Sequence, residues 1–237
     1  MKKVAVILSG CGVFDGAEIH EAVISLLALA RQGASVQCFA PNVPQLHVIN
    51  HLTGEVSEGE NRNVLVEAAR ICRGQIRDAA ELDAADFDAL LVPGGFGAAK
   101  NLCDFAIKGA ECRIQPDVLK ACQSFARAGK PAAYICIAPA MIPLIYGAGT
   151  LATIGNDEGA ANAIEAMGGS HLDCPVSEFV VDQERKVIST PAYMLANNIV
   201  EAADGIEKTV KQLLALWPGR PKQAGRSRSG PLSFRSV

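Results

Sequence analysis

The N-terminal part of the chain carries the pattern that most restricts its fold. Lys3–Leu8 is a short apolar run, Ser9–Gly16 is a glycine-rich turn, Ala17–Gln32 repeats apolar residues at helical spacing, and Ser35–Ala40 is a second apolar run. A strand, a helix and a strand in this order predict a βαβ unit. Its right-handed crossover requires the two strands to lie parallel in one sheet.

In the predicted first helix, apolar side chains recur at helical spacing and form one stripe. Such a stripe is typical of the face that a helix buries against its sheet. We therefore expect five side chains to pack into the core: Ile19, Val23, Leu26, Leu27 and Ala30.

Strands and amphipathic helices continue to alternate along the chain. Further strands are predicted at 89–92 and 132–136, with a late hairpin at 179–182 and 186–189. Further helices are predicted at 63–73, 116–128, 139–145, 157–167 and 193–217. This order favours an α/β fold with an open, doubly wound, mostly parallel sheet, helices on both faces, and the hairpin added late.

The composition is that of a globular domain with a basic tail. Of 237 residues, 49% are hydrophobic and 20% charged, and we assign residues 1–217 to one domain. Residues 218–237 are rich in Gly, Pro, Arg and Ser and are expected to form a disordered basic tail. The net charge is −3 despite this tail, so the domain is acidic, which argues against binding to nucleic acid.

No segment predicts a membrane span or a secretion signal. The first apolar run is too short for a signal-peptide core, and no stretch approaches the roughly 20 apolar residues of a membrane span. We therefore expect a cytoplasmic protein. Its eight cysteines lack CxxC pairs, and its four histidines lack metal-ligand spacing, so no metal site is predicted.

Ligands of doubly wound sheets bind at the carboxyl ends of the strands. Three features fall at that edge: the turn with Cys11 and Gly12, the loop Pro93–Ala99, and Cys136 at the end of a strand. The loop begins Pro-Gly-Gly-Phe, and consecutive glycines let backbone N–H groups approach an anion closely. Neither dinucleotide-binding nor P-loop spacing is present, which argues against nucleotide binding.

Cys136 stands between an apolar strand and a helix that has Pro139 in its first turn. A thiol at such a turn faces unpaired backbone N–H groups and the positive end of the helix dipole, which favour the reactive thiolate. The arrangement resembles a nucleophile elbow, although Tyr134 is larger than that motif usually allows. The alternative interpretation is a structural cysteine packed in the core.

Glu18 and Glu21 lie three residues apart at the start of the predicted first helix. A glutamate there often only compensates the helix dipole, which explains one of the two. The other, if buried beside Cys136, would have a raised pKa and could move protons. The residues alone leave open which one does so. No histidine stands near Cys136 in the sequence, which argues against a Cys–His hydrolase.

Several segments together resemble a known superfamily. Gly10–Glu21, Pro93–Leu102 and Ala132–Pro139 resemble the class I glutamine-amidotransferase-like superfamily, in its PfpI and parkinsonism-associated deglycase branch. Longer motifs, such as Ile49-Asn-His-Leu-Thr-Gly-Glu and Thr190-Pro-Ala-Tyr-Met, are similar to the bacterial enhancing-lycopene-biosynthesis (ElbB) family. The resemblance spans about residues 1–217 and implies a flavodoxin-like fold.

The resemblance also implies an activity. It indicates a glyoxalase that needs no cofactor and converts glyoxal, with methylglyoxal as a second candidate substrate, to the 2-hydroxy acid, in a homodimer linked to isoprenoid biosynthesis. The implied site has Cys136 as nucleophile, Glu21 as proton shuttle with Glu18 as second choice, the N–H groups of Gly94, Gly95 and Ile137 for the oxyanion, and Cys11, Gly12 and Phe96 in the pocket.

Two other classes of function stay open. In a redox-responsive protein, Cys136 would oxidise to a sulfinate, and Cys11 would act as a resolving thiol. In a noncatalytic regulatory or binding protein of the same fold, the cysteine would carry no turnover.

Overall fold

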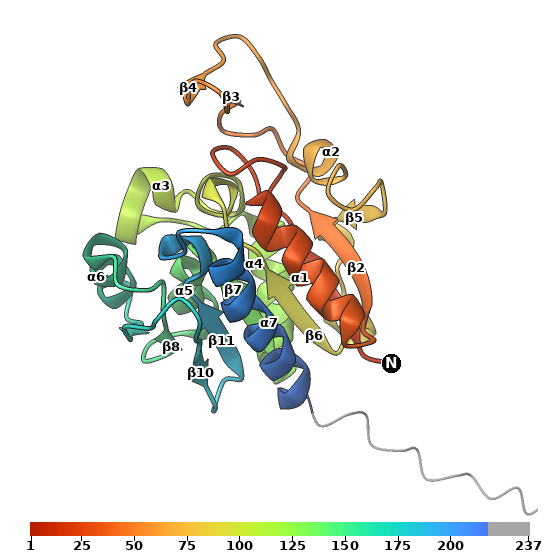
Figure 1. Cartoon of the computed structure of the whole chain (residues 1–237), viewed down its shortest axis with the longest axis vertical. Coiled ribbons are helices and arrows are strands. Elements are labelled where there is room, and N and C mark those ends of the chain that lie inside the picture. Colours follow the sequence, from red (N-terminus) through yellow and green to blue (C-terminus); the bar gives the residue numbers. More distant parts are fainter. Residues whose placement is uncertain (218–237) are drawn as a thin grey trace, which may run out of the picture.

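The computed structural model describes residues 1–217 and has an open, mostly parallel main sheet (Figure 1). The tail predicted at 218–237 lies outside the described residues. The strand order is β10-β11-β7-β6-β1-β2-β5. The strands are β1 (Lys3–Ile7), β2 (Ser35–Ala40), β5 (Ile76–Asp78), β6 (Ala89–Val92), β7 (Ala132–Ile135), β10 (Val180–Asp182) and β11 (Val187–Thr190).

The pairing confirms the predicted fold class. β1 lies parallel to both β2 and β6, as the N-terminal βαβ unit requires, and β7 lies parallel to β6 and β11. β10 pairs antiparallel with β11, which is the predicted late hairpin. Every residue of β6 and β7 is buried, because helices cover both faces of the sheet at these central strands.

The helices form two layers around the sheet (Figure 1). On one face lie α1 (Ile19–Arg31), α2 (Val64–Ala68) and α7 (Ile199–Leu216), and on the other lie α4 (Pro116–Arg127) and α5 (Ile142–Tyr146). Two further helices are α3 (Phe105–Lys108) and α6 (Glu158–Ala166). No helix within residues 1–217 is long and apolar enough to cross a membrane.

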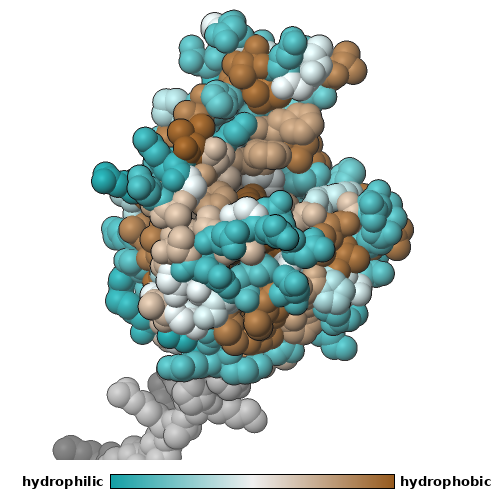
Figure 2. Space-filling model, turned by 90° about the vertical axis from the view of Figure 1, so that its left-hand side faces the viewer, coloured by the Kyte–Doolittle hydropathy of each residue, from teal (hydrophilic) through white to brown (hydrophobic). Residues whose placement is uncertain are grey.

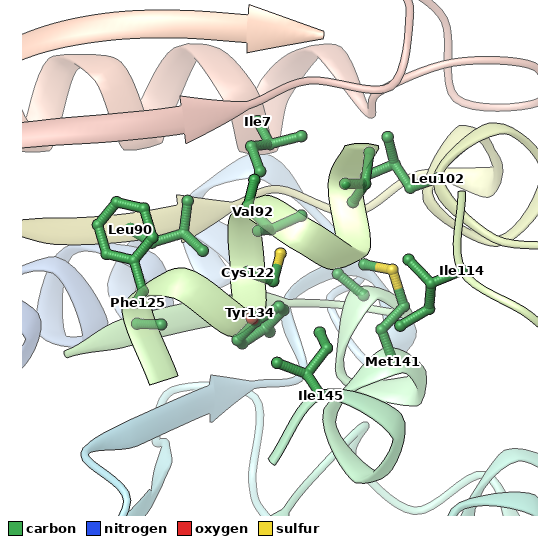
Figure 3. Close-up of a cluster of buried hydrophobic side chains, with 14 of the residues drawn as sticks. Ile7, Leu90, Val92, Leu102, Ile114, Cys122, Phe125, Tyr134, Met141 and Ile145 are labelled. Carbon is green, nitrogen blue, oxygen red and sulfur yellow. The ribbon is translucent and has the colours of Figure 1, made fainter. Parts of the chain in front are cut away.

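Tyr134 fills the core between the sheet and its α4 and α5 layer. Figure 3 shows its ring among Cys122, Phe125 and Met141. Its hydroxyl lies 3.2 Å from the hydroxyl of Tyr146, which satisfies the buried polar group. Cys136 belongs to the cluster on the opposite face, so the bulk of Tyr134 does not crowd the turn there.

The predicted core stripe of α1 is wrong except at Leu26, which is partly buried and packs against the core. Ile19, Val23 and Leu27 are 43%, 46% and 46% exposed, and Ala30 is also exposed. The helix buries its smaller-residue face against α7 and the sheet, since small side chains allow close helix packing. The buried residues are Glu21, Ala22, Ile24, Ser25, Ala28 and Leu29.

Three predicted helices have different bounds. The helix predicted at 193–217 starts at Ile199, because Asn198 caps it by accepting the N–H groups of Val200 and Glu201. The helix predicted at 63–73 ends at Ala68, and the one at 139–145 begins as a 3-10 turn. Five short strands were not predicted: β5 at the edge of the main sheet, and β3 (Ile49–Asn50), β4 (Glu55–Val56), β8 (Leu151–Ala152) and β9 (Ser170–His171).

An arm, residues 41–63, projects beyond the carboxyl end of the sheet and carries β3 and β4 (Figures 1 and 2). Its tip residue Leu52 is 95% exposed. The base of the arm is held to the glycine-rich turn, because Asp15 Oδ2 accepts the N–H of Ile49 at 2.7 Å.

The buried amide of Asn101 joins the arm, the glycine-rich turn and the loop after β6. Its Nδ2 donates to the carbonyls of Ser9 and Asp15 at 2.8 and 2.9 Å. Its Oδ1 accepts the N–H of Leu46 at 3.1 Å. One side chain therefore fixes three loops at the edge of the sheet where ligands are expected.

We expect Asn101→Ala to lower the free energy of unfolding by about 2–3 kcal/mol, since two buried carbonyls lose their donor. Urea unfolding measures the change. The control is Asn162→Ala, at an exposed position of α6, which should stay within about 0.5 kcal/mol of wild type. Equal stability of the two variants would contradict the anchoring role of Asn101.

Candidate active site

Cys136 occupies a sharp turn between β7 and the 3-10 segment Ala138–Met141. Its φ of 62° lies in the left-handed region, and its N–H donates to the carbonyl of Thr190 at 2.9 Å. For a residue with a side chain such a conformation costs on the order of 1–3 kcal/mol and persists only where the surroundings enforce it. The structure thus has the strand-to-helix turn that the sequence predicts at Cys136.

The carboxyl group of Glu21 is fully buried and meets three other segments. Its Oε2 accepts the N–H of Gly94 at 3.0 Å, and its Oε1 accepts the N–H of Tyr193 at 3.2 Å. The thiol of Cys136 is hydrogen bonded to the same carboxyl group. Of the two candidate glutamates, Glu21 is therefore the one that contacts the thiol.

Glu18 has a different position at the start of α1. It is the N-cap residue, and its Oε2 accepts the N–H of Glu21 at 2.6 Å. Its own N–H donates to the carbonyl of Gly94 at 3.0 Å. Glu18 is therefore the glutamate with the structural role at the start of the helix, although it also lines the pocket.

The loop after β6 contributes backbone N–H groups, but not the set that the sequence predicts. Gly94 is a correction, because its N–H already donates to Glu21 and is not free for an oxyanion. The N–H groups of Gly95 and Ile137 instead point at the sulfur of Cys136. A Cβ on Gly94 would overlap both Cys136 and Glu21, so this close approach requires glycine.

Burial controls the protonation of the pair. Desolvation, and then the charge of Glu18, raises the pKa of Glu21 to about 8. Desolvation, and then the charge of Glu21, raises the pKa of the Cys136 thiol well above its ordinary value, although the N–H groups of Gly95 and Ile137 lower it. The predicted preference for thiolate is therefore overruled by burial, and the thiol needs a base to react at neutral pH.

A cavity of about 350 Å³ opens over Cys136. Its walls are mainly apolar and come from Val13, Phe96, Ala99, Phe105, Ala106 and Met194. Phe96 lies in the pocket as predicted.

Cys11 and Gly12 do not line this cavity, which corrects their predicted place. Cys11 has Glu67, Arg70 and Asp15 as its charged neighbours. Gly12 faces His51, on the side of the turn that meets the arm. Of the glycine-rich turn, residues 9–16, only Val13 lines the pocket.

Six residues that line the cavity were not predicted as site residues: Val13, Ala99, Phe105, Ala106, Tyr193 and Met194. Tyr193 contacts Glu21 through its N–H, and its hydroxyl is hydrogen bonded to His20 Nδ1 at 2.8 Å. Its position just after the buried strand β11 was an available signal, since the carboxyl ends of parallel strands meet at the ligand edge. Phe105 and Ala106 come from a short helix without a periodic pattern.

No group of three or more His, Cys, Asp and Glu side chains in the described part of the chain is arranged to hold a metal ion. The thiol of Cys136 and two backbone N–H groups lie at the base of the cavity, the buried carboxyl group of Glu21 contacts this thiol, and Glu18 is part of the lining. This set can perform nucleophilic addition to a carbonyl, with proton transfer by the carboxyl group.

The fold and this site define a protein of the class I glutamine-amidotransferase-like type. No protein-family model matches the chain. It is 48% identical to the human glutamine amidotransferase-like class 1 domain-containing protein 3, mitochondrial, over 90% of this chain and 83% of that protein. The chain belongs to the glutamine amidotransferase-like class 1 domain family of that human protein.

Solved structures agree with this assignment. An isoprenoid biosynthesis protein with an amidotransferase-like domain from Ehrlichia chaffeensis is 37% identical, with a TM-score of 0.85, over 91% of this chain and 99% of that one. Glyoxalase III from Candida albicans shares the fold at 16% identity and a TM-score of 0.59, over 91% of this chain and 97% of that one.

The raised pKa of Glu21 predicts a pH-dependent stability. The native carboxyl group holds its proton up to about pH 8, whereas its ordinary pKa is 4.5. Stability from this group is therefore complete below about pH 4.5 and is lost as the pH rises through 8. In Glu21→Gln, the loss of unfolding free energy between about pH 5 and pH 8 should shrink by several kcal/mol, at about 1.4 kcal/mol per pKa unit.

Urea unfolding at several pH values measures this dependence. Glu165→Gln, at an exposed position of α6, is the control and should keep the wild-type dependence on pH. If the two variants respond to pH alike, the buried carboxyl group of Glu21 does not have the raised pKa.

Proposed function

We propose that this protein is a cofactor-independent glyoxalase that converts glyoxal, and also methylglyoxal, to the 2-hydroxy acid. The observation that carries the proposal is the buried pair of Cys136 and Glu21, with the N–H groups of Gly95 and Ile137 directed at the sulfur. A thiol, a base with a pKa near 8 and two donors are what carbonyl addition followed by proton transfer needs.

The proposed reaction begins when the Glu21 carboxylate takes the thiol proton and the sulfur of Cys136 bonds to the aldehyde carbon. The N–H groups of Gly95 and Ile137 hold the resulting oxyanion, which takes the thiol proton back from Glu21 and becomes a hemithioacetal, so that Glu21 is again a carboxylate. Glu21 then removes the proton from that carbon and returns it to the neighbouring carbon, while the hydroxyl proton of the hemithioacetal passes, through the enediol, to the oxygen of the neighbouring carbon. The product is a thioester, which water hydrolyses to release the 2-hydroxy acid and the free thiol.

The relatives support this proposal at the level of class. The similar Ehrlichia structure is named for isoprenoid biosynthesis, which agrees with the resemblance to the ElbB family, and the Candida protein of the same fold is named glyoxalase III. We extend both the glyoxalase activity and the link to isoprenoid biosynthesis to this chain as proposals. The human relative is named as mitochondrial, and a cytoplasmic place for this chain remains our expectation.

The redox-responsive alternative has less support. Cys136 is 7% exposed and its thiol pKa is raised, whereas oxidation-sensing cysteines are exposed and of low pKa. Cys11, the resolving thiol of that alternative, is not among the residues that line the cavity over Cys136.

Glyoxal turnover tests the proposed function. We expect Cys136→Ser to reduce kcat/KM to background and Glu21→Gln to reduce it about 10²–10⁴-fold, since a positioned acid–base group contributes that much. Wild-type kcat/KM should rise with pH and level off above about pH 8, because the carboxylate form of Glu21 is the base. Cys122→Ser, at a buried thiol outside the pocket, is the control for loss of a cysteine. Equal, near-background rates of wild type, Cys136→Ser and Glu21→Gln would refute the glyoxalase proposal.

We also propose a homodimer that buries the exposed stripe of α1. Ile19, Val23 and Leu27 are four residues apart and face outward together. A two-fold axis between two copies of this helix would bury the same apolar face on both copies.

Val23→Glu should convert the dimer to a monomer, because burying two like charges at such a contact is unfavourable. Size-exclusion chromatography with light scattering measures the mass. Val66→Glu, on α2 and 62% exposed, is the matched control and should remain dimeric. A monomeric wild type, or a dimeric Val23→Glu, would rule out this interface.

A further inference from the structure

We propose that the pocket prefers uncharged 2-oxoaldehydes whose substituent is apolar and about the size of a phenyl ring, over glyoxal itself. The inference rests on the proposed glyoxalase function and adds the class of substrate. It follows from the charge, the polarity and the size of the cavity over Cys136.

The first observation is the charge of the pocket. Among the described residues, no lysine, arginine or histidine lines it, and Glu18 is its acidic group. The amine of Lys100 is engaged nearby, because its Nζ donates to the carbonyl of Phe14 at 2.9 Å and lies 5.3 Å from the centre of the Phe96 ring. An anionic substrate would lose its hydration without gaining a counter-ion, which is costly in an apolar site.

The second observation is the separation of polar and apolar walls. The groups that can hold a carbonyl oxygen, the N–H groups of Gly95 and Ile137, lie at the base beside the thiol. Phe96, Phe105 and Met194 are apolar side chains of the lining. A substrate with both carbonyls at the base therefore presents its remaining substituent to an apolar wall.

The third observation is size. The cavity of about 350 Å³ is within the range of pockets that hold small organic ligands, roughly 300–1,000 Å³. Glyoxal has two carbons and two oxygens, which at roughly 30 Å³ per atom, the share of a water molecule in the liquid, would fill only about a third of it. The rest of the space suits an apolar substituent, which would displace water from the wall.

The reaction on such a substrate is balanced without a further reagent. The 2-oxoaldehyde R–CO–CHO takes up one water and becomes R–CHOH–COOH. The aldehyde carbon is oxidised to the acid while the ketone carbon is reduced to the alcohol. The proton that Glu21 removes from the first carbon is the one that it returns to the second. Phenylglyoxal would thus give mandelate.

Matched substrates test the preference on the full chain. We expect kcat/KM for phenylglyoxal to exceed that for glyoxal at least tenfold, since even one methylene in an apolar pocket is worth about 10–200-fold. For 4-carboxyphenylglyoxal, which differs from phenylglyoxal by one negative charge, kcat/KM should be at least about tenfold lower than for phenylglyoxal. Equal values for the charged and uncharged rings, or a higher value for glyoxal, would overturn the inference.

Matched variants test the wall. Phe105→Ala should lower the ratio of the phenylglyoxal to the glyoxal kcat/KM about tenfold, because the ring loses an apolar neighbour. Ile107→Ala, on the same helix but 58% exposed and outside the lining, should leave that ratio unchanged. Thermal unfolding of both variants checks that they remain folded. An unchanged ratio in folded Phe105→Ala would count against the assigned wall.

The outcomes separate this inference from the proposed function. If wild type turns over both substrates but prefers glyoxal, the substrate class is wrong and the glyoxalase function stands. If it turns over none of the three substrates above the level of Cys136→Ser, the glyoxalase function is wrong. The preference of the pocket is then decided by alkylation of Cys136 with phenacyl bromide and with iodoacetate, each rate divided by that of free cysteine. A normalised rate that is higher for phenacyl bromide supports the inference, and an equal or lower one overturns it.

Discussion

The buried carboxyl group of Glu21 is the contact on which the site depends. It holds the loop after β6 through Gly94, the turn after β11 through Tyr193, and the thiol of Cys136 after β7. Three strand ends are thus tied to the start of α1 by one side chain. Because these contacts are hydrogen bonds in a dry environment, each is stronger than it would be in water, and losing the carboxyl group leaves several partners unsatisfied at once.

Much of the fold was predictable from the sequence because its central strands are buried on both faces and its longer helices are capped. The apolar runs at β6 and β7 and the proline that begins α4 are local sequence signals. The structure has the predicted strands and helix at these positions. The face of α1 was not predictable, because both sides of that helix carry apolar or small residues. Packing against α7 decided the choice, and that contact joins segments far apart in the chain.

The sequence predicted the main residues of the site and their place in the fold. It did not predict which way their backbone N–H groups and side chains point. Cys136 and Glu21 meet because strand ends and a helix start converge at one edge of a parallel sheet, which topology alone requires. Where an N–H points depends on backbone dihedrals that sequence does not specify. Gly94 therefore donates to Glu21 rather than facing the pocket, and Cys11 faces Glu67 and Arg70 rather than Cys136.

The protonation of the pair narrows its chemistry. A hydrolase thiol is activated by an imidazole that stores the proton as a cation, whereas Glu21 becomes neutral when it takes the proton. A buried site without a counter-ion tolerates a neutral acid much better than a new charge, which is why desolvation raises the pKa of Glu21 to about 8. A carboxyl group near its pKa at neutral pH can both take and return a proton. Isomerisation of a carbonyl compound needs both steps from the same group, so this environment suits proton transfer between neighbouring carbons better than departure of an amine.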